Sequence, residues 1–281
     1  MEPMTSRDIT LTLLSKLEKI LTTKTVCDIV KVPDITMSYN LIVRTKTGLD
    51  NEEKTFIIKV SYDINEVSKD EIVDIVAISR ITSAIPILIG VKEGEEKMRE
   101  DIAYRKMGVI AISISAFKRV LEGKQIRFVK DRGIVKAKVK GEELRKRREE
   151  LGLSLGDVAS MLKVSRKTVY EYERGTFEAS ERTARLLMQY FGEDIIEGVS
   201  LEPKIENCKK YLEHRKVSRE LIQEKFSVEP KEAYKLERTH GKIALVCNDD
   251  EKYLVIPRRR YDENVDKIVN ILDVKPLING E

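Results

Sequence analysis

The chain is poor in the residues that most often build metal sites and disulfide frameworks. Histidine occurs only twice, at His214 and His240, and the three cysteines, Cys27, Cys208 and Cys247, lie far apart. An odd number of widely spaced cysteines fits neither a disulfide framework nor a zinc knuckle. We therefore expect no metal site, no other cofactor and a reducing compartment.

A long apolar run is also missing. No stretch approaches the roughly 20 apolar residues that a membrane-spanning helix requires. The opening residues MEPMTSRDITLTLL lack the basic region and the unbroken apolar core of a signal peptide. These absences predict a cytoplasmic protein with no membrane partner.

The net charge of +4 is concentrated in one segment of the chain. Residues 136–192 contain 13 Lys and Arg against 9 Asp and Glu, a surplus equal to that of the whole protein. A local surplus of positive charge attracts phosphate groups whatever the charge balance elsewhere. This segment is therefore the first candidate for contact with a nucleic acid.

Hydrophobic periodicity predicts a multidomain α/β and all-α protein, with α/β domains on either side of a helical one. The predicted parts are an N-terminal α/β domain at 1–130, a basic linker at 131–140, a helical domain at 141–198 and a small C-terminal α/β domain at 199–281. The C-terminal order of helix, hairpin and helix suggests a reduced second copy of the N-terminal unit.

The helical domain has strong start and stop signals. Helices are expected at 142–151, 155–162, 165–173 and 180–190, with Ser154 and Ser165 as N-caps of the second and third. Only two residues separate these two helices, which forces a sharp crossing. The shared core is expected to comprise Leu144, Leu151, Val158, Leu162, Val164, Val169 and Tyr172.

Burial of Val169 and Tyr172 would turn the other face of the third helix outward. A helix in this setting can present its N-terminal half to the major groove of double-stranded DNA. Arg166 and Lys167 would then donate to guanine edges or phosphates, and Glu171 would accept from a cytosine amino group. The full set of expected DNA-binding residues is Ser154, Ser165, Arg166, Lys167, Thr168, Tyr170, Glu171, Arg174, Arg145 and Lys146.

The run LRKRREELGLSLGDVASMLKVSRKTVYEYERG resembles the helix-turn-helix of the phage repressor and Cro family, also called the XRE family. The resemblance covers about 55 residues and includes Gly152-Leu153-Ser154, Val164-Ser165 and Glu173-Arg174-Gly175. Leu155 and Gly156 depart from it, because the family usually has a Gln and an acidic residue there. The resemblance implies that a phosphate contact of that Gln is replaced here by Arg145, Lys146 or Lys167.

The N-terminal domain resembles the PD-(D/E)xK nucleases and Holliday-junction resolvases in its order of helices and strands. Those enzymes hold Mg²⁺ with two or three carboxylates and place a Lys beside the metal. Here Asn40 and Ile57 occupy the acidic positions, and only Lys59 of the motif remains. The resemblance therefore implies a nuclease-like fold without catalysis. Lys59 itself is expected to be exposed, or paired with Asp63 or Asp74.

The combination of these two domains resembles a family of archaeal HTH-type transcriptional regulators. We expect a homodimer that binds specific double-stranded DNA and is not an enzyme; contacts with the transcription machinery or a small effector stay open. Two alternatives remain, namely a nuclease guided by its helix-turn-helix and an antitoxin-like adaptor whose main partner is a protein. Arg182 and Arg185 are as well explained by a solvated helix face as by phosphate contact.

Overall fold

The structure is a computed structural model that describes residues 5–24, 27–46, 52–247 and 250–279. The chain forms two compact units. Unit 1 consists of residues 1–98, 106–124 and 201–281, and unit 2 consists of residues 99–105 and 125–200. Each unit is described by itself below.

Unit 1 contains the nuclease-like sheet and the C-terminal sheet. Its elements up to residue 124 are α1 (Ser6–Lys24), β1 (Cys27–Lys31), β2 (Leu41–Lys46), β3 (Glu53–Val60), η1 (Ile64–Glu66), α2 (Lys69–Thr82), β4 (Ile85–Gly90), β5 (Lys92–Glu93), β6 (Glu96–Lys97), β8 (Val109–Ser113) and α3 (Ile114–Leu121). Its later elements are η3 (Ile205–Asn207), α8 (Lys209–Glu213), α9 (Arg219–Phe226), β12 (Pro230–Lys235), β13 (Ile243–Cys247), β14 (Lys252–Pro257), η4 (Arg258–Arg260), α10 (Glu263–Leu272) and β15 (Lys275–Asn279).

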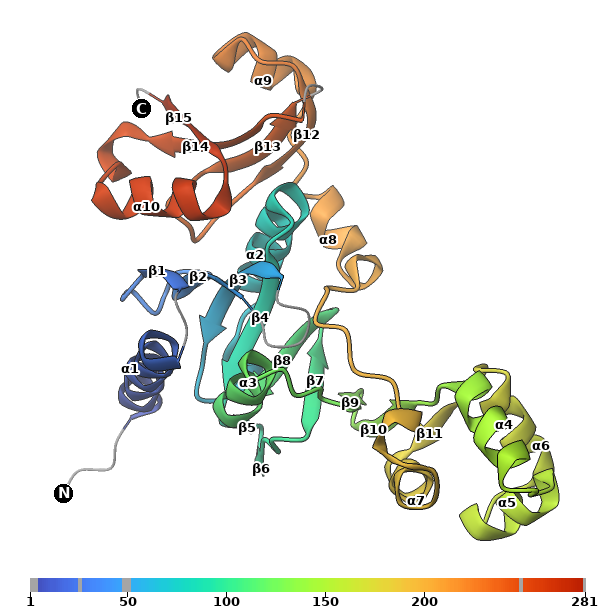
Figure 1. The fold of residues 1–281 in the computed structure, drawn as a ribbon. Coiled ribbons are helices and arrows are strands. Elements are labelled where there is room, and N and C mark those ends of the chain that lie inside the picture. Colours follow the sequence, from blue (N-terminus) through green and yellow to red (C-terminus); the bar gives the residue numbers. More distant parts are fainter. Residues whose placement is uncertain (1–4, 25–26, 47–51, 248–249, 280–281) are drawn as a thin grey trace. The chain divides into compact units, whose positions relative to one another are not determined.

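The N-terminal sheet has the strand order β1-β2-β3-β4-β8. Strands β1, β2 and β3 are antiparallel neighbours, and β3 pairs in parallel with β4 after the crossover helix α2. Ser68 and Glu71 form a capping box at the start of α2. Helices α1 and α3 pack together on the sheet, and α2 packs against both β4 and the C-terminal strands β12 and β13 (Figure 1).

The C-terminal sheet repeats this order of elements. Strands β12, β13 and β14 are antiparallel neighbours, and β14 pairs in parallel with β15 after the helix α10. The packing is reciprocal, because α2 contacts β12 and β13 while α10 contacts β1 and β2. A second copy of the N-terminal unit, which the sequence suggests, would have this arrangement; the copy itself stays a prediction.

One carboxylate joins the two parts of unit 1. The Asp74 side chain on α2 is fully buried, and it accepts hydrogen bonds from Ser38 Oγ (2.7 Å) and Arg215 Nη1 (3.2 Å). The backbone N–H groups of Glu237 and Arg238 also donate to it, at 3.1 and 2.9 Å. A buried carboxylate requires such partners, because an unpaired one costs several kcal/mol. The C-terminal residues are thus part of the core that α2 builds.

Unit 2 holds the helical domain and the strands next to it in the sequence. Its elements are β7 (Ile102–Lys106), β9 (Phe128–Asp131), β10 (Ile134–Lys138), α4 (Gly141–Glu150), α5 (Leu155–Leu162), α6 (Arg166–Glu173), β11 (Glu178–Ser180), α7 (Glu181–Phe191) and η2 (Glu193–Ile195). The strand order is β7-β9-β10-β11, and α7 packs against β10 and β11.

The structure corrects the predicted linker at 131–140. Strands β9 and β10 form a hairpin there, in which Ile134 faces Asp131 across a two-residue turn. Arg132 and Gly133 both have positive φ, of 50° and 81°, as the turn of a tight hairpin requires. Pairing of β10 with β11 ties the hairpin to the start of α7. The basic side chains therefore lie on a paired strand, and the boundaries predicted at 130, 140 and 198 stay predictions.

The predicted fold class is confirmed: a large mixed α/β part at the N-terminus, helix-turn-helix helices in the middle and a small C-terminal sheet. Within the described residues, no helix is long and apolar enough to cross a membrane.

Candidate nucleic-acid interface

Helices α5 and α6 meet at a corner that local hydrogen bonds fix. Ser154 caps α5 in a capping box with Asp157, and Ser165 caps α6 by accepting from the backbone N–H of Thr168 at 3.0 Å. Between the helices, Lys163 adopts a left-handed conformation with φ 56° and ends α5. The N-caps expected from the sequence are confirmed, and the corner has the geometry of a helix-turn-helix.

Helix α6 has a buried face and a basic exposed face. Val169 is fully buried and Tyr172 is 4% exposed, so both face the bundle, in which α6 packs against α4 and α5. Arg166, Lys167 and Tyr170 are exposed on the other side. Among the described residues, neither Arg166 nor Lys167 forms an ion pair.

The guanidinium of Arg166 lies over the first turn of α5. A Cβ atom built on Gly156 would lie 3.0 Å from Nε and 3.1 Å from Nη2 of Arg166. The absence of a side chain at Gly156 therefore leaves room for Arg166. Asp157 is nearby: its hydrogen bonds with Ser154, together with the charge of Arg166, hold the pKa of that carboxyl below its ordinary value. The departure from the family pattern at 156 is thus linked to the placement of a recognition-helix side chain.

Tyr170 and Arg174 form a pair at the exposed surface of α6. The Arg174 guanidinium lies 5.7 Å from the centre of the Tyr170 ring, which is within the range of a cation–π contact. Tyr170 is 49% exposed, and Thr168, which the sequence also assigned to the interface, is half-buried. The hydroxyl groups of Thr168 and Ser165 are 2.8 Å apart. These residues therefore form one continuous face with Arg166 and Lys167.

The structure corrects the expected outward orientation of Glu171. Its side chain is only 16% exposed, and its carboxylate accepts a hydrogen bond from Thr176 Oγ1 at 2.5 Å. Thr176 follows the end of α6. Glu171 therefore contacts the segment after the helix and does not lie on the exposed face. A contact from Glu171 to a cytosine amino group would require this bond to break.

Leu151 is a second correction. The sequence assigned it to the shared core, but it is 60% exposed. It is the C-cap residue of α4, just before Gly152, whose φ is +65°. The chain turns away from the bundle at this point, so the side chain does not reach the core formed by Leu144, Val158 and Leu162.

Sequence reasoning missed the ion pair between α4 and the end of α6. Arg148 Nε lies 2.6 Å from Oε1 of Glu173, and the two side chains are only 12% and 7% exposed. Arg148 also donates to the carbonyl oxygen of Leu153 at 3.0 Å. The Glu-Arg-Gly sequence at 173–175 could be recognised in the sequence. That Arg148 is the partner of Glu173 could not be predicted from it. The pair fixes the C-terminal end of α6 on the bundle.

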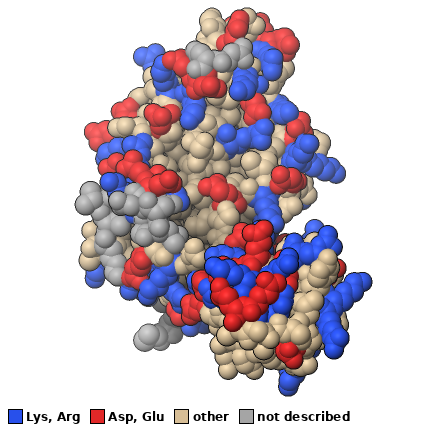
Figure 2. Space-filling model, turned by 45° about the vertical axis from the view of Figure 1, so that its right-hand side comes forward, with Lys and Arg blue, Asp and Glu red and all other residues tan. Residues whose placement is uncertain are grey.

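The other cations of α4 differ in their availability. Arg145 and Lys146 are each 67% exposed and pair along the helix with Glu149 (3.0 Å) and Glu150 (4.0 Å). Exposed pairs of this kind contribute little stability, so either cation can turn to a phosphate. Arg147 instead bonds to the carbonyl oxygen of Phe191, the last residue of α7, and to Asp194 beyond that helix. Figure 2 shows Lys and Arg interspersed with Asp and Glu over the face that it presents.

The positions of the nuclease motif are occupied by groups that do not fit a metal ion. Asn40 is buried, and its Oδ1 accepts from the backbone N–H of Val60 at 3.0 Å. Ile57 is fully buried and has no ligand atom. Mg²⁺ requires oxygen ligands with near-octahedral geometry, which an amide engaged by the backbone and an isoleucine do not supply. No group of three or more His, Cys, Asp or Glu residues that could hold a metal occurs in the described part of the chain.

Lys59 is buried in a closed set of contacts, which corrects its expected exposure or pairing with Asp63 or Asp74. Its Nζ donates to the carbonyl oxygens of Ile35 and Met37, both at 2.7 Å, and lies 2.6 Å from Oε1 of Glu71. Burial acts to raise the pKa of the Glu71 carboxyl, but the hydrogen bond and charge of Lys59, together with the bonds to Ser68, hold that pKa below its ordinary value. The lysine therefore serves the packing of α2 on β3.

Comparison with known proteins agrees with both domains. Residues 11–126 match a model described as a PD-(D/E)XK superfamily domain, and residues 144–198 match one described as a helix-turn-helix. No solved structure matches the chain.

Several archaeal proteins are similar over much of the chain. A protein of Saccharolobus solfataricus, named "Putative HTH-type transcriptional regulatory protein", is 33% identical over 226 residues, which cover 77% of this chain and 70% of that protein. A relative of Saccharolobus islandicus with the same description is 33% identical over 227 residues, with the same two coverages. One of Pyrobaculum aerophilum is 36% identical over 152 residues, or 53% of this chain and only 61% of the relative's length. The chain therefore belongs to the family of these archaeal HTH-type transcriptional regulatory proteins, and it combines a PD-(D/E)XK superfamily domain with a DNA-binding helix-turn-helix.

Proposed function

We propose that this protein regulates transcription by binding specific double-stranded DNA, with the N-terminal half of α6 in the major groove. The observation that carries the proposal is the division of α6 into two faces. Val169 and Tyr172 hold the helix in the bundle, while Arg166 and Lys167 are exposed on the opposite face and form no ion pair in the described part of the chain.

The chemistry of the exposed face suits the edges of base pairs. An arginine or lysine donates to O6 and N7 of guanine, and each good bidentate contact discriminates by about 1–3 kcal/mol. Arg166 is already positioned over Gly156, which reduces the conformational entropy lost when it binds. Tyr170 offers an aromatic surface to apolar groups such as the thymine methyl. In this proposal, Arg166 and Lys167 determine sequence preference.

Phosphate contacts would position the helix. Arg145, Lys146 and Arg174 carry exposed positive charges, and the N-termini of α5 and α6 begin at Ser154 and Ser165. Helix N-termini favour anions. At α5 the carboxylate of Asp157 already occupies this end. The N-terminus of α6 is therefore the better binding site for a phosphate.

We further propose that the protein acts as a homodimer. One recognition helix covers only a few base pairs, and dimers of this motif bind half-sites about one helical turn apart. The reciprocal packing of α2 on β12 and β13 and of α10 on β1 and β2 already covers these strands within one chain. A dimer would therefore use another surface.

The nuclease-like domain has a scaffolding role in this proposal and is not catalytic. Lys59 contacts two carbonyl oxygens and Glu71, and the acidic positions of the motif hold Asn40 and Ile57. A Lys that is buried and paired with a carboxylate in this way cannot activate a water molecule at a metal.

Selection of bound duplexes from a random or genomic pool by the purified full chain tests the proposal. We expect enrichment of a short motif, with an approximate two-fold repeat if the dimer forms. Retention of DNA without any sequence preference would contradict it. An adaptor protein would instead show no enrichment and would retain a stoichiometric protein partner in a pull-down.

A further inference from the structure

Two grooves of unit 1 lie at corresponding places in its two sheets. The larger has a volume of about 720 Å³ and lies between the end of α2 and strands β12, β13 and β14. The smaller, of about 310 Å³, lies between the end of α10 and strands β1 and β2. The correspondence follows from the reciprocal packing of the two helices.

Backbone pairing makes the correspondence exact to the residue. The same two hydrogen bonds recur at the start of β2 and of β13: Val32 N to Asn40 O and Asn40 N to Ile58 O in the first sheet, and Leu236 N to Lys242 O and Lys242 N to Val255 O in the second. Counting along the paired strands places the row Glu232, Val246 and Lys252 where the first sheet has Asp28, Arg44 and Thr55. Val246 thus occupies the place of Arg44.

Arg44 lines the smaller groove. Its Nη2 donates to the carbonyl oxygens of Asn270 and Ile271, both at 2.7 Å, at the C-terminal end of α10. Carbonyls at the end of a helix attract cations, and the one of Asn270 also accepts from the backbone N–H of the C-cap residue Asp273. Arg44 therefore satisfies two of them with one guanidinium.

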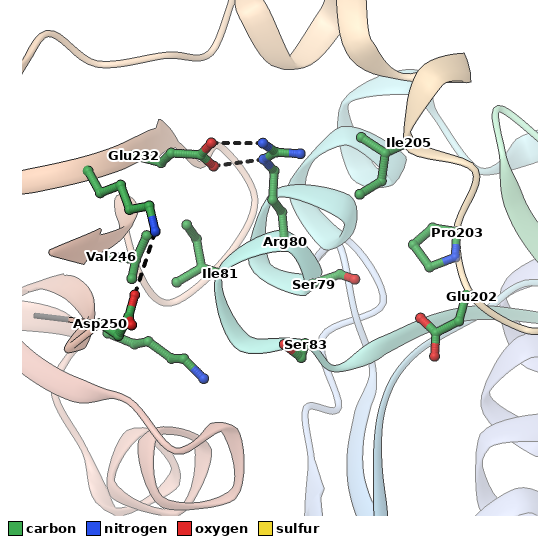
Figure 3. A pocket seen from close by; sticks show the side chains of 12 residues that line it. Ser79, Arg80, Ile81, Ser83, Glu202, Pro203, Ile205, Glu232, Val246 and Asp250 are labelled. Carbon is green, nitrogen blue, oxygen red and sulfur yellow. Dashed lines mark hydrogen bonds and ion pairs between the residues drawn. The ribbon is translucent and has the colours of Figure 1, made fainter. Parts of the chain in front are cut away.

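The larger groove has no such cation from the strand, because Val246 is too short and apolar. Helices α2 and α10 both end on a left-handed C-cap, Ser83 (φ 61°) and Asp273 (φ 54°). Counted back from these caps, the carbonyls of Arg80 and Ile81 correspond to those that Arg44 binds. Figure 3 shows Arg80 and Ile81, from the last turn of α2, facing Glu232 and Val246 across the groove.

The basic residues of this groove differ in whether they already have an acidic partner. Arg80 is engaged by Glu232 in two hydrogen bonds of 2.7 Å, and Lys231 lies 3.7 Å from Asp250. Within the described residues, Lys252 is the one basic residue of the wall that forms no ion pair. It faces Val246 directly across the strands, and Glu232 is one strand further away, or roughly 10 Å from it. An anion beside Lys252 would therefore displace no ion-pair partner among the described residues.

We propose that this groove binds a small zwitterion of the arginine class, with its cation on the Arg80 and Ile81 carbonyls and its carboxylate on Lys252. The cationic end takes the place that Arg44 has in the other sheet. The apolar stem lies on Ile81 and Val246. A volume of about 720 Å³ is within the usual range for small-molecule sites.

The site is placed to regulate DNA binding, a part of the inference that rests on the proposed function. Glu202, Pro203 and Ile205 form one wall of the groove, and unit 2 ends at residue 200. A ligand that contacts this wall changes the conformational freedom of the segment that leaves the helix-turn-helix unit. Occupancy would then alter the affinity for the operator.

Calorimetric titration of the full chain tests the binding itself. The probes are L-arginine, agmatine, which lacks the carboxylate, and L-citrulline, which lacks the cation. We expect L-arginine to bind more tightly than either analogue. Lys252→Ala should weaken L-arginine binding by about tenfold or more and leave agmatine binding unchanged, because only the carboxylate contact is lost. Lys235→Ala, on the same sheet outside the groove, should bind like the wild type.

A second variant separates the site from a general loss of charge. Val246→Arg places in the larger groove the side chain that binds the helix carbonyls in the smaller one, and it should abolish L-arginine binding while the chain stays folded by circular dichroism. Absence of L-arginine binding up to about 10 mM, where even a Kd near 1 mM would be seen, overturns the proposal. Equal binding by the wild type and both groove variants also overturns it.

DNA anisotropy then tests the regulatory part separately. L-arginine should change the operator affinity of the wild type and have no effect on Val246→Arg. Binding of L-arginine without a change in operator affinity would refute the regulation and leave the site standing. If no operator is found at all, the proposed function fails, and calorimetry still decides the site.

Discussion

Arg148 on α4 and Glu173 at the end of α6 form an ion pair of 2.6 Å that is almost entirely shielded from solvent. It connects the first helix of the bundle to the last residue of the helix that we propose to enter DNA. Arg148 also donates to the carbonyl of Leu153, so one side chain fixes both the end of α6 and the turn before α5.

Loss of one partner of this pair should destabilise unit 2. Arg148→Ala leaves the Glu173 carboxylate without its buried cation, and we expect a loss of about 3 kcal/mol. Arg145→Ala, which removes an exposed pair on the same helix, should cost less than about 1 kcal/mol. Urea unfolding monitored by circular dichroism measures both. Equal effects of the two substitutions would show that the buried pair has no special role.

Substitutions on the two proposed kinds of DNA contact should differ in character. Arg166→Ala should lower affinity for the selected sequence by about 1–3 kcal/mol and relax the preference at one base pair. Lys146→Ala should weaken binding equally on all sequences and reduce the salt slope by about one unit. Arg132→Ala, in the exposed turn between β9 and β10, is the control for loss of one charge. If Arg166→Ala and Arg132→Ala behave alike in anisotropy titrations, α6 is not the recognition helix.

Gly156 and Arg166 should be coupled in DNA binding. A Cβ at position 156 would lie 3.0–3.3 Å from three guanidinium atoms of Arg166, so Gly156→Ala should displace that side chain. Alanine is the better helix former by about 1 kcal/mol, and the variant should therefore be at least as stable as the wild type. We expect several-fold weaker specific binding from Gly156→Ala alone and no further loss when Arg166→Ala is already present. Additive losses in this double-mutant cycle would refute the coupling.

The Lys59–Glu71 pair predicts a defined pH dependence of stability. The folded-state pKa of Glu71 lies below the ordinary value of 4.5. The stability that the carboxylate contributes is thus fully present above about pH 4.5 and is lost as the pH falls through the folded-state pKa. Lys59→Met should cost about 3 kcal/mol at pH 7, because an unpaired carboxylate stays buried. This penalty should shrink as the pH falls to and below 4.5, because the unpaired Glu71 of the variant takes up a proton and the wild type then loses the contribution of its own carboxylate.

The double variant Lys59→Met, Glu71→Gln is the matched control for this pH dependence. It removes both charges and should recover most of the stability at pH 7, although the carbonyls of Ile35 and Met37 lose their donor. A Lys59→Met penalty that is the same at pH 7 and pH 4 would contradict the assignment of the pair.

The wild type should not cleave DNA. Supercoiled plasmid incubated with the protein and either Mg²⁺ or Mn²⁺ should remain supercoiled, because Asn40 and Ile57 offer no carboxylate for a metal. Nicking that disappears in Lys59→Met, in a preparation purified identically, would show that the domain is an enzyme after all.

The parts of the fold that depend on local chemistry were predictable. Ser154 and Ser165 were expected as N-caps from their positions before two helical patterns, and α5 and α6 begin directly after them. The exposure of Lys167 followed from the burial of Val169 and Tyr172, which lie three residues apart and share the opposite helix face.

Contacts between distant residues were not predictable from one sequence. Along the sequence, Asp63 is closer to Lys59 than Glu71 is, and Asp74 is about as far away. The fold nevertheless brings Glu71 to Lys59. Glu171 faces Thr176 because of how the chain leaves α6. Strand β12, helix α9 and strand β15 were also missed. Their mixed charged and apolar residues give a weak periodic signal, and only pairing with β13 and β14 makes them regular.

Unit 1 is assembled from both ends of the chain, with α2 enclosed by residues that come more than a hundred positions later. A chain truncated after the helix-turn-helix would therefore lose more than a C-terminal tail. Asp74 would be left without Arg215 and the N–H groups of Glu237 and Arg238, and the apolar face beside it would be open to water. The last 80 residues are thus part of what allows the first 100 to stay folded.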